Sequence, residues 1–213
     1  SERGPLGLKV QAAGKHYFVD KAPFTTLEQV EEARRSVRET GKVWGICYSE
    51  RLQNEAAVCA DQLVADGAIG RVLQVIGLGP HRLQASDRPD WFFKKDTYGG
   101  ILIDLGSHQI EQFLYYAGAT SATITSSRVA NYNHPEYPEL DDFGDAALVA
   151  DTGVTNYFRV DWFTPDGLST WGDGRTIILG TDGYIELRKN LDVAREQTLD
   201  HVYLVNGKEE KHL

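Results

Sequence analysis

Apolar residues recur at helical spacing between Gly99 and Gly118. At about 3.6 residues per turn, one arc of this stretch carries apolar or small residues, namely Leu102, Ile103, Gly106, Ile110, Phe113, Leu114 and Ala117. The opposite arc carries polar side chains and a tyrosine, namely Asp104, His108, Glu111, Gln112 and Tyr115. The pattern predicts one continuous amphipathic helix with this second arc on its polar face, ending at Gly118.

Helical and strand patterns alternate over the first 48 residues. A helical stretch precedes an apolar strand at 16–20, and a second helical stretch precedes another apolar strand at 43–48. This order, with short connections, is typical of the end of a doubly wound parallel sheet. Ligands bind such sheets beyond the carboxyl ends of the strands, which is where Asp20 and Lys21 would lie.

Strand patterns dominate the rest of the chain. A helix at 54–66, a strand at 71–78 and a long loop at 79–98 precede the central helix. After that helix, patterns separated by turn residues predict strands at 122–130, 143–150, 154–162, 175–180, 184–188 and 201–205. The sequence therefore predicts an α/β unit over 1–48, followed over 49–213 by an α+β unit. The second unit is a mostly antiparallel open sheet with helices on one face.

The chain has 213 residues and a formal net charge of −9, and 41% of its residues are hydrophobic. An acidic protein lacks the positive footprint that nucleic acids and anionic membranes require, so we expect neither as a partner. No apolar run reaches the roughly 20 residues that span a bilayer, and no signal peptide opens the chain. Cys47 and Cys59 form neither a Cys-x-x-Cys pair nor a disulfide framework, which favours a cytoplasmic location. Because Met is absent, we expect the chain to begin inside a longer gene product.

Asp104 and His108 are four residues apart, so on a helix their side chains would lie one above the other. A carboxylate at that spacing could orient the imidazole and hold it near a pKa suited to proton transfer. The alternative is an ordinary surface ion pair. A metal site at this pair is a weaker alternative, because no third ligand is adjacent in the sequence and the long loop offers only His81. We expect no metal.

Two positions outside the central helix are further candidates for chemistry. Lys21 directly follows a strand, where partial desolvation would lower its pKa and make it a donor or an acid; the alternative is a solvated loop lysine. The loop at 79–98 is long and aromatic, which is more typical of functional loops than of structural ones. The candidate substrate-binding residues in this loop are His81, Arg82, Trp91 and Tyr98.

Three segments, in this order and spacing, resemble the glucose–fructose oxidoreductase / inositol dehydrogenase (Gfo/Idh/MocA) family. They are Asp20-Lys21-Ala22-Pro23 after a strand, Tyr48-Ser49-Glu50-Arg51 after the next strand, and Gly99-Gly100 followed by Asp104 and His108. That family uses a Glu-Lys-Pro motif at the end of its dinucleotide-binding (Rossmann) domain and an Asp-x-x-x-His helix in its second domain. This chain departs from the first motif, because Asp20 replaces Glu and Ala22 separates Lys21 from Pro23.

The resemblance implies an oxidoreductase, dependent on NAD or NADP, that interconverts a secondary alcohol and a ketone of a sugar or cyclitol. His108 would be the general acid–base, and Asp104 would position the substrate and the imidazole. Lys21 would contact both the reacting hydroxyl and the nicotinamide side. Asp20 and Arg51 would lie close to the cofactor.

No Gly-x-Gly-x-x-Gly motif precedes these segments. We therefore expect residues 1–48 to be the last part of a Rossmann domain and 49–213 to be a substrate-binding and oligomerisation domain. As a fragment, the chain alone would bind no dinucleotide. We also expect a homo-oligomer, a dimer or tetramer, through the open face of the sheet, because strand 154–160 carries large side chains on both faces. The alternative function is a non-catalytic ligand-binding or dimerisation protein derived from the same fold.

Overall fold

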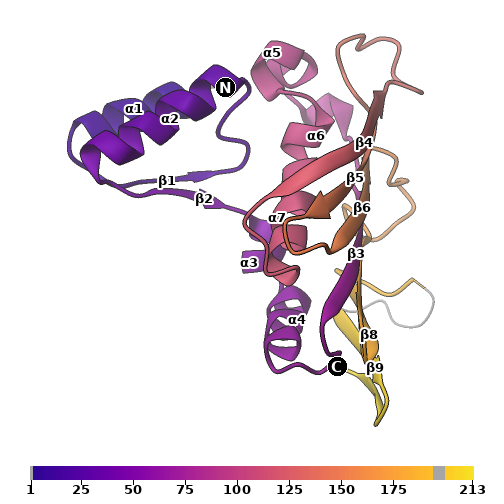
Figure 1. Cartoon of the computed structure of the whole chain (residues 1–213). Coiled ribbons are helices and arrows are strands. Elements are labelled where there is room, and N and C mark those ends of the chain that lie inside the picture. The colour runs from indigo at the N-terminus through magenta and orange to yellow at the C-terminus, as the bar shows by residue number, and fades with distance from the viewer. Residues whose placement is uncertain (1, 194–199) are drawn as a thin grey trace.

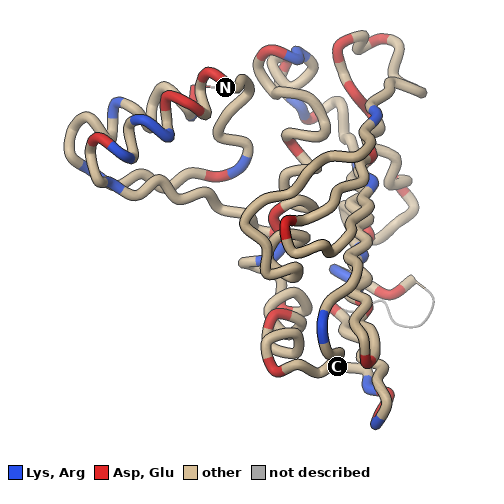
Figure 2. The backbone as a smooth tube through the Cα atoms, viewed as in Figure 1, with Lys and Arg blue, Asp and Glu red and all other residues tan. Residues whose placement is uncertain are grey.

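The computed structural model describes residues 2–193 and 200–213 (Figure 1). Within them, the strands form one sheet of two strands and one sheet of eight. The chain's acidic and basic side chains are interspersed over both parts of the molecule (Figure 2). None of the helices described is long and apolar enough to cross a membrane.

The small sheet pairs β1 (Tyr17–Asp20) with β2 (Trp44–Cys47) in parallel. Helices α1 (Arg3–Ala12) and α2 (Leu27–Thr40) pack against each other and lie along one side of this sheet (Figure 1). The order of helices and strands, and the parallel pairing, are those that the sequence predicts for residues 1–48. The carboxyl end of β1 points toward the helices of the large sheet, so the loop that follows β1 lies where the two parts meet.

The large sheet has the strand order β10-β9-β8-β7-β3-β6-β5-β4. Its strands are β3 (Val72–Pro80), β4 (Ala122–Ala130), β5 (Phe143–Ala150), β6 (Thr155–Asp161), β7 (Gly174–Gly180), β8 (Gly183–Lys189), β9 (His201–Asn206) and β10 (Glu210–His212). Every neighbouring pair is antiparallel except β3 and β6. The mostly antiparallel open sheet is therefore confirmed, and β4 and β5 have the predicted bounds. The short strand β10 was not predicted.

Helices cover one face of this sheet (Figure 1). They are α3 (Ser49–Leu52), α4 (Glu55–Ala65), α6 (Ile101–Asp104) and α7 (Gly106–Tyr116). Strand residues that face them form the core, and Phe158 and Ile178 are 1% and 0% exposed. The predicted loop at 79–98 contains three short helical turns, namely η1 (Ala85–Asp87), η2 (Asp90–Phe93) and α5 (Lys95–Tyr98).

The central stretch is not one helix, so that prediction is wrong. Helices α6 and α7 are separate and meet at Leu105. The polar arc is also wrong in part, because His108 and Gln112 are only 3% and 1% exposed. Gln112 accepts a hydrogen bond of 2.6 Å from Lys189 of β8. Buried polar groups are tolerated where they find such partners, and a count of apolar spacing cannot detect partners that come from a distant strand.

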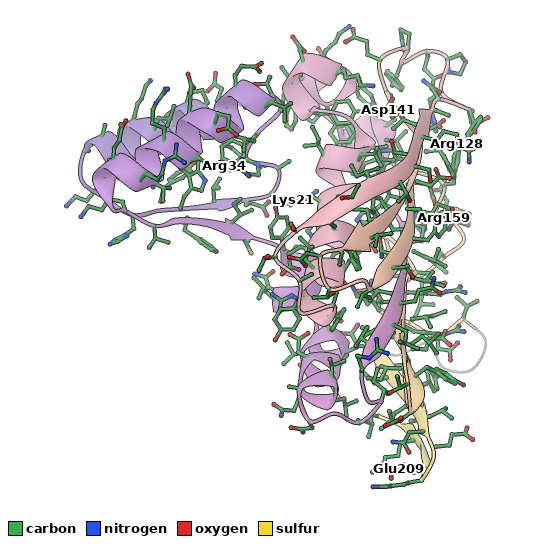
Figure 3. All side chains as sticks on the ribbon, viewed as in Figure 1. Lys21, Arg34, Arg128, Asp141, Arg159 and Glu209 are labelled. Carbon is green, nitrogen blue, oxygen red and sulfur yellow. The ribbon has the colours of Figure 1, made fainter. Side chains whose placement is uncertain are left out.

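No described helix covers the other face of the large sheet. Alternation along the strands turns large side chains toward this open face, where Tyr157 and Leu179 are 40% and 42% exposed. Arg128 and Arg159 lie on the same side (Figure 3) and flank Asp145 in the register of β4, β5 and β6. The open face is thus an apolar surface that also carries charged residues.

Candidate active site

A cavity of about 730 Å³ lies at the carboxyl end of β1. Its walls come from the loop after β1, the start of α1, the segment after β3, and α6. The predicted site residues that line it are Asp20, Lys21, His81, Trp91, Tyr98 and Asp104. This volume is within the roughly 300–1,000 Å³ typical of small-molecule sites. Figure 3 shows Lys21 where the small sheet meets the helices of the large sheet.

Lys21 and Asp104 form an ion pair in the wall of this cavity. The Lys21 Nζ atom lies 2.6 Å from Asp104 Oδ1, and it also donates a hydrogen bond of 3.0 Å to the Asp104 main-chain oxygen. Asp104 is the last residue of α6, which begins directly after Gly99-Gly100, where both glycines have positive φ angles. The Arg3 guanidinium donates to the main-chain oxygen of Lys21. The peptide bond between Lys21 and Ala22 is cis.

His108 lies on the buried side of α7, where it is 3% exposed. Its ring makes an edge-to-face contact with Tyr48, with 5.9 Å between the ring centroids. Its Nδ1 atom is buried and has no hydrogen-bond partner, so Nε2 is the only ring nitrogen that a bound molecule could reach. Burial lowers the pKa of His108 to about 4, although the charge of Glu50 acts in the opposite direction.

The predicted stacking of Asp104 on His108 is not found. Among the described residues, no hydrogen bond or ion pair joins these two side chains, and the Asp104 carboxylate is paired with Lys21 instead. Asp104 and His108 belong to different helices, α6 and α7, so the spacing rule for a continuous helix does not apply to them. Asp104 faces the cavity, whereas His108 is not among the residues that line it.

His81 connects the cavity to a buried cluster of charges. Its Nδ1 atom lies 3.2 Å from the Gly79 main-chain oxygen, and its Nε2 atom lies 3.6 Å from Glu50 Oε1. The other oxygen, Glu50 Oε2, lies 3.7 Å from the Nζ atom of Lys189. Burial lowers the pKa of His81, partly offset by the charge of Glu50. Burial also lowers the pKa of Lys189.

The sequence analysis did not single out Glu50 and Lys189 as site residues. Glu50 lies inside the Tyr48–Arg51 segment, but nothing in its local pattern indicates burial. Lys189 offers a clearer signal, because it follows Ile185 and Leu187 at strand spacing and so occupies a position expected to be apolar. A lysine at such a position indicates a buried partner of opposite charge.

Aromatic side chains form another wall of the cavity. Trp91, 54% exposed, lies beside Phe92, which in turn contacts Trp162, and the Arg88 guanidinium lies over the Phe92 and Trp162 rings at 4.4 and 5.0 Å. The hydroxyl of Tyr98 accepts a hydrogen bond of 2.9 Å from the Asp141 main-chain N–H. Burial raises the pKa of Tyr98. An aromatic wall opposite a few charged groups is typical of sites that bind small polar molecules.

Arg51 and Arg82 do not line the cavity. The Arg51 guanidinium donates to Glu111 at 2.6 and 2.8 Å and to Asp61 at 2.9 Å, and thereby ties α3 to α4 and α7. Burial opposes the charge of Arg51, but these two carboxylates raise its pKa. Arg82 donates to the main-chain oxygens of Pro165 and Leu168.

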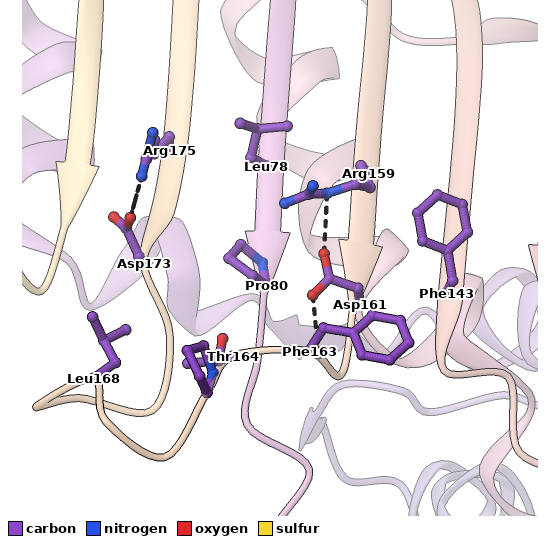
Figure 4. Close-up of a pocket in the computed structure, with 11 residues that line it drawn as sticks. Leu78, Pro80, Phe143, Arg159, Asp161, Phe163, Thr164, Leu168, Asp173 and Arg175 are labelled. Carbon is purple, nitrogen blue, oxygen red and sulfur yellow. Dashed lines mark hydrogen bonds and ion pairs between the residues drawn. The ribbon is translucent and has the colours of Figure 1, made fainter. Parts of the chain in front are cut away.

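A second cavity, of about 500 Å³, lies on the open face of the sheet (Figure 4). Two ion pairs flank it, Arg159 with Asp161 and Arg175 with Asp173. None of the predicted site residues lines it. In the part of the chain that the structure describes, no group of three or more His, Cys, Asp or Glu side chains is arranged to hold a metal ion.

Comparison with known proteins gives a family match and several related dehydrogenases. The family described as the GFO/IDH/MocA C-terminal domain matches residues 58–186. The chain is 31% identical over 105 residues to D-xylose dehydrogenase of Paenarthrobacter nicotinovorans, a match that covers 47% of this chain and 27% of that protein. It is 27% identical over 191 residues to scyllo-inositol 2-dehydrogenase (NAD(+)) of Bacillus subtilis (strain 168), covering 87% and 52%.

A crystal structure from Erwinia carotovora atroseptica SCRI1043, which carries only a provisional oxidoreductase description, superposes on the whole chain with a TM-score of 0.96. The two sequences are 54% identical, and the match covers 100% of this chain and 63% of that one. The chain thus spans only part of the length of the proteins that it resembles.

Proposed function

Because this chain belongs to the Gfo/Idh/MocA family, we propose that it is part of an NAD- or NADP-dependent oxidoreductase acting on a sugar or cyclitol. The reaction would interconvert a secondary alcohol and a ketone. Residues 1–48 would be the end of the dinucleotide-binding domain, and residues 49–213 would bind substrate. The relatives named as dehydrogenases of D-xylose and scyllo-inositol support this substrate class.

The observation that carries the proposal is the Lys21–Asp104 ion pair, which lies in a cavity at the carboxyl end of β1. Lys21 would donate a hydrogen bond to the reacting oxygen, and Asp104 would hold the ammonium in place. His108 would take the hydroxyl proton at Nε2 during alcohol oxidation and return it during ketone reduction. Trp91 would pack against the apolar face of the sugar ring.

The residues present fit the nicotinamide end of such a cofactor. When bound, a nicotinamide ring would accept or supply the hydride. Asp20 and Lys21 follow a strand of a parallel pair, the usual position of nucleotide-binding residues in such sheets. The main-chain N–H of Lys21 holds the Asp20 carboxylate at 2.9 Å, and both residues line the cavity. The name of the scyllo-inositol relative, which includes NAD(+), supports the same cofactor class.

The test is steady-state turnover by the full-length gene product on a panel of aldoses, inositols and their ketones. His108→Asn should lower kcat by roughly 10²–10⁴-fold, the usual contribution of a positioned acid–base group. Lys21→Met should be at least as damaging, whereas Lys15→Met, an exposed lysine six residues earlier, should leave kcat unchanged. Near-parental kcat in His108→Asn would refute the assignment. Absence of turnover by the parent protein with every substrate and both cofactors would favour the non-catalytic alternative.

The oligomer remains part of this proposal. The apolar side chains on the open face, including Tyr157 and Leu179, support association through that face, with a second copy of the chain as the partner. Light scattering by the full-length protein at micromolar concentration should give the molar mass of a dimer or tetramer. Tyr157→Lys should weaken the association and so lower the molar mass that is measured in solution. A strict monomer in the parent protein would exclude the idea. The cytoplasmic location stays a prediction.

A further inference from the structure

Glu50 is a carboxylate held below the cavity among positive and titratable groups. Its side chain is 10% exposed. Gln109 of α7 donates to Oε2 at 3.2 Å, and Lys189 of β8 lies 3.7 Å from the same oxygen. Oε1 is buried without a hydrogen-bond partner and lies 3.6 Å from His81 Nε2. A buried carboxylate with one satisfied and one unsatisfied oxygen can accept one further donor.

The tautomer of His81 points to that donor. Its Nδ1 atom lies 3.2 Å from the Gly79 main-chain oxygen, which can only accept, so Nδ1 carries a hydrogen. Neutral His81 would then direct the lone pair of Nε2 at the negative Oε1 of Glu50. A second proton on Nε2 would convert this repulsion into an ion pair. The geometry therefore favours proton uptake by His81 beside Glu50.

Glu50 also lies close to His108, because it accepts a hydrogen bond from Gln109, the next residue of α7, and the His108 ring contacts Tyr48, two residues before Glu50. The negative charge of Glu50 favours the imidazolium of both histidines and thus opposes the effect of burial on each. Lys189 and Lys21 act in the opposite direction on His108. The carboxylate stays ionised despite burial, because Lys189, the two histidines and Lys21 lower its pKa.

We propose that Glu50 is a positioning residue for the proton-transfer step, acting as the buried counter-ion that His81 and His108 share, with Lys189 as the opposing charge. The effect of Glu50 on proton transfer rests on the proposed function. Its effect on the pKa values of the two histidines depends only on this chain's own residues. Alcohol oxidation would turn the neutral imidazole of His108, which is 3% exposed, into an imidazolium. The negative charge of Glu50 would stabilise this imidazolium.

Every element packed around the cluster contributes to its charge balance. Lys21 comes from the loop after β1, His81 from the end of β3, His108 from α7, and Lys189 from β8. Asp104, at the end of α6, adds a weaker negative influence on His81. Asp200 and Glu111 add negative charge that acts on Lys189, whereas Glu50 is the carboxylate that acts on Lys189 and on both histidines. Charge-removing changes at Glu50 and at Lys189 should therefore shift the histidine pKa values in opposite directions.

The test is NMR titration of ¹³C,¹⁵N-histidine-labelled full-length protein, with His81 and His108 assigned through His81→Asn and His108→Asn. Glu50→Gln, which is nearly isosteric, should lower the pKa of at least one of the two histidines by about one unit or more. Lys189→Met should raise it. Glu55→Gln, the same change at an exposed glutamate five residues later, should leave both values within about 0.3 units. Glu50→Asp, which keeps the charge, should move the values back toward the parent.

Histidine pKa values that stay within about 0.3 units in Glu50→Gln would overturn the proposal. If Glu50→Gln does not fold, the titration of Lys189→Met is the test. Histidine pKa values that are unchanged or lowered in Lys189→Met would equally overturn the proposal. In active protein, the acid limb of the kcat/KM profile for alcohol oxidation should move to lower pH in Glu50→Gln by the shift that NMR measures. The two proposals can fail separately. If the parent protein shows no turnover but the histidine pKa values shift as stated, the proposed function is refuted and the electrostatic role of Glu50 is supported.

Discussion

The Lys21–Asp104 ion pair joins the small-sheet part of the molecule to the helices of the large sheet, and its strength can be predicted. The two side chains are 20% and 17% exposed, and the charged atoms are 2.6 Å apart. Coulomb's law gives about 4 kcal/mol for unit charges 4 Å apart at an effective dielectric constant of about 20, and desolvation and side-chain entropy oppose that gain. We expect a net coupling energy of about 1–3 kcal/mol, in the range of charge-assisted hydrogen bonds.

A double-mutant cycle measures this coupling energy. Urea unfolding of the full-length parent, Lys21→Met, Asp104→Asn and the double variant gives the four free energies of unfolding that the cycle requires. The matched control is the Arg34–Glu31 pair, which has a similar distance of 2.8 Å but side chains that are 65% exposed. That exposed pair should couple by about 0.5 kcal/mol or less. A Lys21–Asp104 coupling no larger than that of Arg34–Glu31 would refute the claim that partial burial makes this pair strong.

Three further predictions concern stability, measured by urea or thermal unfolding. The pKa of His108 falls from 6.5 to about 4 on folding, so protonation of this side chain favours the unfolded state. Its contribution to the free energy of unfolding, about 3 kcal/mol, is present above pH 6.5 and is lost as the pH falls toward 4. A free energy of unfolding that falls with pH as steeply in His108→Asn as in the parent would contradict this. Gly77→Ala should destabilise by about 1–3 kcal/mol, since its Cβ would lie 2.2 Å from Gln109 Oε1, whereas Gly167→Ala meets nothing within 4 Å and should be near neutral. Tyr98→Phe leaves the main-chain N–H of Asp141 without its acceptor and should cost about 1–3 kcal/mol, so an unchanged melting temperature would exclude this role for the hydroxyl.

The strands of the large sheet could be predicted from the sequence because their signals are local. Alternation of large and small side chains and turn sequences such as Asp151-Thr152-Gly153 set the ends of β4, β5 and β6 to within a residue or so. The position of β3 in the middle of the sheet, parallel to β6, could not be predicted in this way. Strand order depends on pairings between distant segments, and apolar periodicity carries no information about them.

The candidate site could be predicted where the signal is local, at the ends of regular elements and in the long aromatic loop, from which Trp91 and Tyr98 line the cavity. Lys21 ends a strand and Asp104 lies at a glycine-preceded helix, and both line the cavity. The burial of His108 and Gln112 was not predicted, because a helical wheel places polar residues on the exposed arc. Gln112 accepts a hydrogen bond from Lys189 of β8, and the His108 ring packs against Tyr48, which directly precedes α3. Burial of this kind depends on partners far along the chain, so a helical-wheel pattern assigns these residues to the wrong face.

With α6 and α7 separate, the acid–base role proposed for His108 would call for a carboxylate other than Asp104. On one continuous helix, Asp104 could have served as the counter-ion of His108. In the folded chain Asp104 is at the cavity wall, where it pairs with Lys21 at 2.6 Å, and among the described residues it makes no hydrogen bond or ion pair with His108. The imidazolium that alcohol oxidation would create on His108 therefore depends on another negative group. Glu50, in α3, is the carboxylate whose charge raises the pKa of His108, against the effect of burial.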